Sequence, residues 1–153
     1  MSVLTEYADL LRQNIGLCGK PLTTEVEKGA VRKFARAIGE TNPLYFDPEY
    51  AVTTRFGAMI APPTFVSALM SMDLPPLPDP PVPFTVTLHT DDLIKQFAPI
   101  KVGDVITSVP KLVDAFVKTG RNGEMLFTTF AYEFTNSDGD LIANVAWTEV
   151  QRP

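Results

Sequence analysis

Hydrophobic residues recur at helical spacing in two stretches near the start of the chain. The first covers residues 3–15, and Ser2 stands where an N-cap is expected. The second covers residues 28–38, with Lys and Arg opposite the apolar stripe, and Gly39 follows at the usual C-terminal position. Between them, residues 23–27 read as a short strand. The pattern therefore predicts two amphipathic helices before residue 40.

The segment 64–72 is apolar nearly all round. A helix without a polar face is buried on most of its surface, and Pro62-Pro63 fits the start of such a helix. The following stretch, residues 74–83, holds six prolines in ten positions. We expect a stiff, extended loop there, crossing from the buried helix to the sheet.

The remainder of the chain is rich in β-branched and aromatic residues. It predicts strands over residues 84–88, 104–117, 125–135 and 141–150. Residues 119–123 form a turn, and the Asp-Gly pair in 136–140 is a hairpin signal, so the last three strands form an antiparallel meander. Pro110 predicts a sheet edge or a bulge at that point. Together these elements indicate an α+β chain in which a curled antiparallel sheet wraps a central apolar helix, the hot-dog fold.

Composition narrows the function classes. The chain has 153 residues, a formal net charge of −5, one cysteine and one histidine. We expect one domain over residues 1–153, without a disulfide framework or a Cys/His zinc site. The negative net charge argues against nucleic acid and membrane as partners. No stretch resembles a membrane span or a secretory signal. Cytoplasmic localisation is the expectation.

Four motifs occur in a familiar order. They are GETNPLYFDPEYA at residues 39–51, FG through IAPPTF at 56–65, APIKVGD at 98–104 and DGD at 138–140. This series resembles the MaoC-like, or (R)-specific, enoyl-CoA hydratases and dehydratases from about residue 23 to residue 150. The segments 61–65 and 28–38 are most similar to the N-terminal, fatty-acid-synthase-like dehydratase branch, which includes HadA- and HadC-type subunits.

The resemblance implies a function. Family members add water to, or remove it from, an acyl thioester carried by coenzyme A or a carrier protein, and they need no cofactor. An Asp and a His five residues apart move the proton. A backbone N–H at the start of the central helix stabilises the thioester oxyanion. Members of this branch pair with a second, catalytic hot-dog half.

This sequence departs from the family pattern at each catalytic position. Glu40 replaces the Asp, Tyr45 replaces the His, and Pro63 stands where active members have a glycine. Proline has no N–H to donate, and a tyrosine titrates near 10. The resemblance therefore implies a degenerate half that binds the acyl chain beside a catalytic partner. Glu40 and Tyr45 are the candidate catalytic positions, and the substrate-binding candidates are Asn42, Pro62, Pro63 and Thr64.

Two alternatives stay open. In the first alternative, the chain is a self-sufficient hydratase that uses Glu40 together with Tyr45 or His89. His89 lies close to acidic residues in sequence. Otherwise it is a non-enzymatic, ligand-binding hot-dog homodimer. A basic face on the second helix, formed by Arg32, Lys33 and Arg36, either meets the phosphates of coenzyme A or is simply solvated. Cys18 is expected to be inert.

Overall fold

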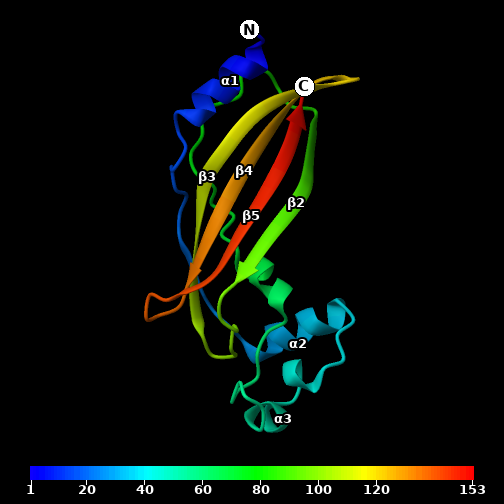
Figure 1. Cartoon of the computed structure of the whole chain (residues 1–153), viewed down its shortest axis with the longest axis vertical. Coiled ribbons are helices and arrows are strands. Elements are labelled where there is room, and N and C mark those ends of the chain that lie inside the picture. Colours follow the sequence, from blue (N-terminus) through cyan, green and yellow to red (C-terminus); the bar gives the residue numbers. More distant parts are fainter.

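The computed structural model describes residues 1–153 and has an elongated shape (Figure 1). A five-stranded antiparallel sheet forms most of its length, in the order β1-β3-β4-β5-β2. A separate group of short helices lies at one end (Figure 1). The helical elements are α1 (Val3–Arg12), α2 (Lys28–Ala37), the 3-10 helix η1 (Pro43–Tyr45), α3 (Pro48–Val52) and the 3-10 helix η2 (Pro63–Leu69). The strands are β1 (Leu22–Glu25), β2 (Val86–Gln96), β3 (Val105–Gly120), β4 (Gly123–Thr135) and β5 (Leu141–Arg152).

The two early helices form where the apolar stripes predict them. The Ser2 side chain accepts a hydrogen bond from the Thr5 N–H at 3.1 Å, and α1 places four residues in the core, including Leu4 and Leu11. Gly39 follows α2 with a φ of +77°, a conformation that a side chain disfavours. No helix of the chain is long and apolar enough to cross a membrane.

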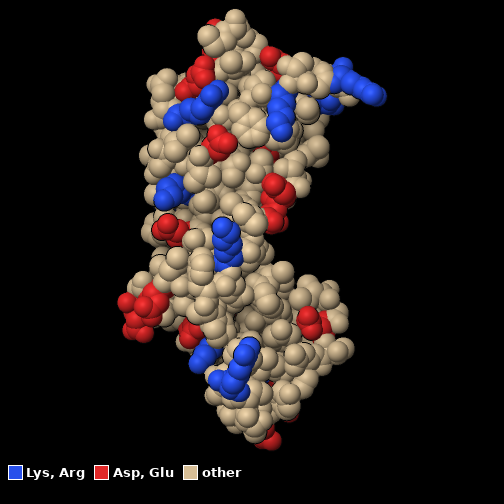
Figure 2. Space-filling view, in the orientation of Figure 1, with Lys and Arg blue, Asp and Glu red and all other residues tan.

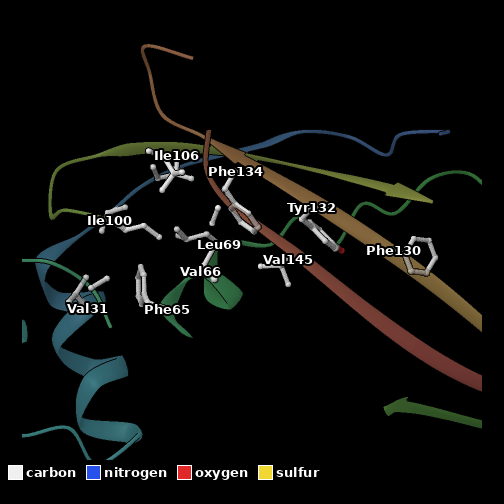
Figure 3. Close-up of a cluster of buried hydrophobic side chains, with 14 of the residues drawn as sticks. Val31, Phe65, Val66, Leu69, Ile100, Ile106, Phe130, Tyr132, Phe134 and Val145 are labelled. Carbon is white, nitrogen blue, oxygen red and sulfur yellow. The ribbon is translucent and has the colours of Figure 1, made fainter. Parts of the chain in front are cut away.

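The predicted meander of the last three strands is confirmed, because β3, β4 and β5 are neighbours in the sheet. Alternate residues of β4 enter the core, and Phe130, Tyr132 and Phe134 lie with Val145 of β5 in one apolar cluster (Figure 3). Pro110 lies beyond the last paired residue of β1, whose register with β3 ends at Ser108, and a bulge follows between Leu112 and Asp114. The sequence-based expectation of a sheet edge or bulge near Pro110 therefore holds.

The hot-dog fold is confirmed, but its expected central helix is much reduced. Residues 63–69 form a 3-10 helix instead of a longer helix to residue 72. Phe65, Val66 and Leu69 are buried, whereas Ser67 and Ala68 face solvent and Met72 is 77% exposed. The prediction of burial on all sides was wrong, because only one side of this turn meets the sheet and the rest borders a groove described below.

The segment that follows η2 is extended, as its prolines predict. Two tyrosines bind it to the rest of the fold: the Tyr132 hydroxyl donates to the Ser71 carbonyl at 3.0 Å and the Tyr7 hydroxyl to the Pro78 carbonyl at 2.6 Å. Ser71 is itself buried and its N–H donates to the Ser108 hydroxyl at 3.0 Å. This extended segment thus covers part of the sheet that a longer helix would have covered.

Strand β2 is longer than predicted. The sequence indicated residues 84–88, whereas the strand continues to Gln96 through the polar run His89 to Asp92. It pairs with β5 and is the last strand on its side of the sheet. Polar residues obscured it in the sequence, because an edge strand exposed on both faces has no apolar alternation to detect.

Glu149 of β5 faces the same side of the sheet as buried Thr128, its register partner. Burial raises the pKa of its carboxyl above the ordinary 4.5, although the nearby His89 opposes the shift. Because this pKa is higher in the folded than in the unfolded state, the carboxyl favours folding at pH values below its unfolded-state pKa. That contribution to stability is lost as the pH rises through the folded-state pKa. Glu149→Gln should therefore stabilise the protein at pH 7 and much less at pH 4.

Urea unfolding at both pH values tests this prediction. Glu25→Gln, at an exposed position on β1, is the matched control and should change the free energy of unfolding by less than about 0.5 kcal/mol at either pH. An equal gain from Glu149→Gln at pH 4 and pH 7 would show that charge burial is not the cause.

Candidate functional site

The loop after α2 is shaped by its own polar side chains. The Glu40 N–H donates to the Ala35 carbonyl at 2.9 Å, which closes the end of α2. The Asn42 side-chain oxygen accepts from the Leu44 N–H at 3.0 Å and so begins η1. Asp47 accepts from the N–H groups of Glu49 and Tyr50 and begins α3. The signature segment is therefore a chain of short capped turns, which fixes where Tyr45 lies.

Two basic residues of α2, Arg32 and Arg36, contact this loop. The Arg32 guanidinium donates twice to the Phe46 carbonyl, at 3.0 and 2.7 Å, and Arg36 lies 6.0 Å from the centre of the Phe46 ring. Figure 2 shows basic and acidic side chains interspersed on the viewed face, with no large area of one sign. Of the predicted basic face, Arg32 and Arg36 thus contact the loop, and Lys33 lies at the wall of a second groove described below.

A groove of about 360 Å³ separates the signature loop from the end of β2. Its walls come from three parts of the chain, within residues 44–45, 56–63 and 96–99. They are largely apolar, and the lining residues are Leu44, Tyr45, Phe56, Ile60, Ala61, Pro63, Gln96, Phe97, Ala98 and Pro99. The Ala61 N–H donates to the Ile100 carbonyl at 2.8 Å, which joins two of these walls. Two predicted site residues, Tyr45 and Pro63, thus share one groove.

Glu40 lies close enough to Tyr45 to affect its ionisation. Burial is the main cause that raises the pKa of the Tyr45 phenol above its ordinary value of 10.0, and the negative charge of Glu40 raises it further. The phenol is therefore protonated at neutral pH. It can donate a hydrogen bond, but it cannot take up a proton as the imidazole of an Asp/His pair does.

The start of η2 lacks the donor that the resemblance requires. Pro63 is the first residue of this turn and has no N–H, and the Phe65 N–H is used by the Pro62 carbonyl at 2.9 Å. Thr64 supplies the first N–H of the turn and its side chain is exposed, whereas Pro62 is buried. Pro63 therefore removes a backbone donor from the groove wall.

His89 is too far away to replace the missing imidazole within this chain. It lies seven positions before Gln96 on the same strand, or roughly 23 Å at ~3.3 Å per residue. Its Nε2 contacts Asp92 at 3.0 Å, and its ring stacks on Trp147 with centroids 5.2 Å apart. His89 thus belongs to a polar cluster on the sheet and lies outside the groove.

Sequence reasoning missed Gln96 and Phe97, which complete the groove. Gln96 is the last residue of β2 and Phe97 follows it, and the sequence pattern placed the end of that strand eight residues too early. Phe97 is 58% exposed. The available signal in the sequence was an apolar residue, Phe97, directly before the APIKVGD motif. Which residues surround Phe97 depends on how β2 pairs with β5, and this pairing cannot be read from the sequence.

A second groove, of about 510 Å³, lies on another side of η2, between α2 and β1. Phe34, Phe65, Ala68 and Leu69 give it an apolar floor, and Lys33 lies at its wall with Glu25 and Glu27. Phe34 and Phe65 meet edge to face with centroids 5.3 Å apart. The exposed side of η2 therefore borders an apolar space.

Comparison with solved structures places this arrangement among known hot-dog proteins. The chain superposes on the HadBC (3R-hydroxyacyl-ACP dehydratase) complex of Mycobacterium tuberculosis with a TM-score of 0.71 and 23% identity, over 90% of this chain and 96% of the other. It superposes on the R-hydratase PhaJ1 of Pseudomonas aeruginosa with a TM-score of 0.70 and 22% identity, over 96% and 84%. These similarities confirm the fold.

Sequence comparisons identify the family. A UPF0336 protein of Parafrankia sp. is 34% identical over 131 residues, 84% of either chain. A UPF0336 protein of Thermobifida fusca is 33% identical over 124 residues, 78% of either chain. The family model described as "FAS1-like, dehydratase domain region" matches residues 13–145. The chain therefore belongs to the FAS1-like dehydratase-domain family.

Proposed function

We propose that this chain is the non-catalytic half of an enoyl-thioester hydratase or 3-hydroxyacyl-thioester dehydratase, of the HadA/HadC type. It would hold an acyl thioester, carried by coenzyme A or a carrier protein, while a partner hot-dog chain supplies the proton-transfer groups. The main observation that supports this proposal is the apolar groove lined by Tyr45 and Pro63, because both residues are chemically unsuited to the family reaction.

The groove explains how binding and catalysis can be separated. Its apolar walls suit an acyl chain, and the protonated Tyr45 phenol is a donor for a carbonyl oxygen. Losing an acid–base group typically costs 10²–10⁴-fold in rate, and losing an oxyanion donor about 10²–10³-fold. Two solved relatives by fold, HadBC and ChsH1-ChsH2 of Mycobacterium tuberculosis, are complexes of two chains, which supports a partner for this one.

The purified chain should not hydrate a short trans-2-enoyl-CoA. The loss of conjugated thioester absorbance should proceed at least about 10³-fold more slowly than with an intact family member assayed alongside. Calorimetry of the same sample should show saturable binding of the acyl-CoA. Turnover at an ordinary rate that Glu40→Ala abolishes would contradict the proposal and favour a self-sufficient hydratase. Absence of both turnover and binding would contradict the acyl-binding role.

Phe97→Ala should weaken acyl-CoA binding about fivefold, because it removes an exposed apolar wall of the groove. Leu22→Ala, an exposed apolar truncation on β1 outside the groove, is the control and should leave the dissociation constant unchanged. Equal affinities of Phe97→Ala and the unmodified chain would place the acyl chain elsewhere. Co-expression with a hot-dog chain that carries the intact Asp/His pair should restore turnover.

A further inference from the structure

The groove between the signature loop and the end of β2 has only two polar side chains in its lining. They are Tyr45 of η1 and Gln96, the last residue of β2, and every other lining side chain is apolar. Both polar side chains are partly buried. The side-chain hydrogen bonds that a ligand in this groove can form are therefore limited to these two residues.

One hydrogen bond decides which end of the Gln96 amide is free. The Nε2 group donates to the Ala98 carbonyl at 3.0 Å, and a carbonyl oxygen can accept only from the N–H end of an amide. The buried side-chain polar atoms without a partner are Asn144 Oδ1 and Trp147 Nε1. Gln96 Oε1 is not one of them, so it is a free acceptor that solvent can reach at the groove wall.

Tyr45 supplies the complementary donor. Its phenol is protonated at neutral pH, because burial and the charge of Glu40 raise its pKa. The backbone N–H groups of Tyr45, Ala61 and Phe97 already donate to other carbonyl groups of the chain. The phenol hydroxyl thus remains as a donor on the wall that faces Gln96.

A donor on one wall and a free acceptor on the other suit the two forms of the proposed ligand unequally. A 3-hydroxyacyl thioester has a carbonyl oxygen that accepts and a hydroxyl on its third carbon that donates. A 2-enoyl thioester has the carbonyl oxygen but no donor on its third carbon. An enoyl chain that covers Gln96 removes water from Oε1 without replacing its hydrogen bond, which is unfavourable.

We propose that Gln96 is a specificity-determining residue, through which the groove selects a 3-hydroxyacyl thioester over the corresponding 2-enoyl thioester. The Tyr45 phenol donates to the thioester carbonyl of both ligands, and Gln96 Oε1 accepts from the hydroxyl that only one of them has. This inference rests on the proposed acyl-binding role and extends it to the state of hydration of the bound chain.

Calorimetry of the full chain with (3R)-3-hydroxybutyryl-CoA and trans-2-butenoyl-CoA tests the selection. These two ligands differ by one water molecule, added across the double bond. The hydroxyacyl ligand should bind about fivefold more tightly, as expected for one additional hydrogen bond at a partly exposed site. Gln96→Leu keeps an apolar wall of similar size but has no acceptor, so it should bind both ligands with equal affinity.

Two further variants separate this selection from a general change in binding. Tyr45→Phe removes the donor that both ligands use, so it should weaken both by a similar factor and keep the preference for the hydroxyacyl form. Gln13→Leu makes the same substitution at an exposed position at the end of α1, outside the groove, and should change neither affinity. Circular dichroism should show each variant folded.

The outcomes distinguish this inference from the proposed function. Equal affinities of the unmodified chain for the two ligands would overturn the inference and leave the acyl-binding role standing. A Gln96→Leu variant that still prefers the hydroxyacyl ligand would do the same. Binding of neither ligand to the unmodified chain would contradict the proposed function and this inference together.

Discussion

Replacing Phe65 by alanine is expected to lower the free energy of unfolding by about 3–5 kcal/mol, the usual range for a buried Phe. Phe65 is only 3% exposed and belongs to the main core cluster. It packs edge to face on Phe34, and Figure 3 shows it in one apolar cluster with Val31 of α2 and Ile100. Because η2 is a single short 3-10 helix, its position depends on this packing more than on helical hydrogen bonds.

Urea unfolding of Phe65→Ala beside Phe65→Leu measures the cavity contribution. The leucine variant keeps most of the volume and should lose less than half as much stability. Phe65→Ala should also weaken acyl-CoA binding, since η2 contributes to both grooves. A loss below about 1 kcal/mol for Phe65→Ala would show that η2 is not anchored through this residue.

Gly19→Ala is the second change with a large expected effect, about 3 kcal/mol of lost stability from overpacking. A Cβ at Gly19 would meet the Asp73 carbonyl oxygen, the Leu74 carbonyl carbon at 2.7 Å and Pro110 Cγ at 2.9 Å. Two of these neighbours are backbone atoms, which have no rotamer to change. The Gly19 N–H also donates to the Pro110 carbonyl at 2.9 Å, so relief of the clash would break the contact between two segments.

Gly29→Ala is the matched control, because a Cβ there has no neighbour within 4 Å. Gly29 lies in α2, where alanine is favoured over glycine, and the substitution should raise stability by about 0.5 kcal/mol. Thermal and urea unfolding of the two variants give the comparison. A Gly19→Ala protein as stable as the unmodified chain would mean that the extended segment after η2 shifts freely.

The helices and the meander were predictable because their signals are local. The stripe from Val31 to Ala35, the Ser2 and Asp47 caps and the Asp-Gly hairpin each act within a few residues. The family signature could also be read from one segment, since its turns are closed by their own side chains, such as Asn42 bonding to Leu44. The departures at Glu40, Tyr45 and Pro63 were equally visible in the sequence.

The sequence by itself determined the hot-dog fold and the family. Tertiary structure alone decided that residues 63–69 form a half-exposed 3-10 helix, that β2 continues to Gln96, and that Gln96 and Phe97 face Tyr45 across a groove. The reason is physical. A helix that is apolar on all sides can be buried or can border a groove. An edge strand exposed on both faces shows no alternation of apolar and polar residues. Both outcomes depend on which distant segment packs beside them.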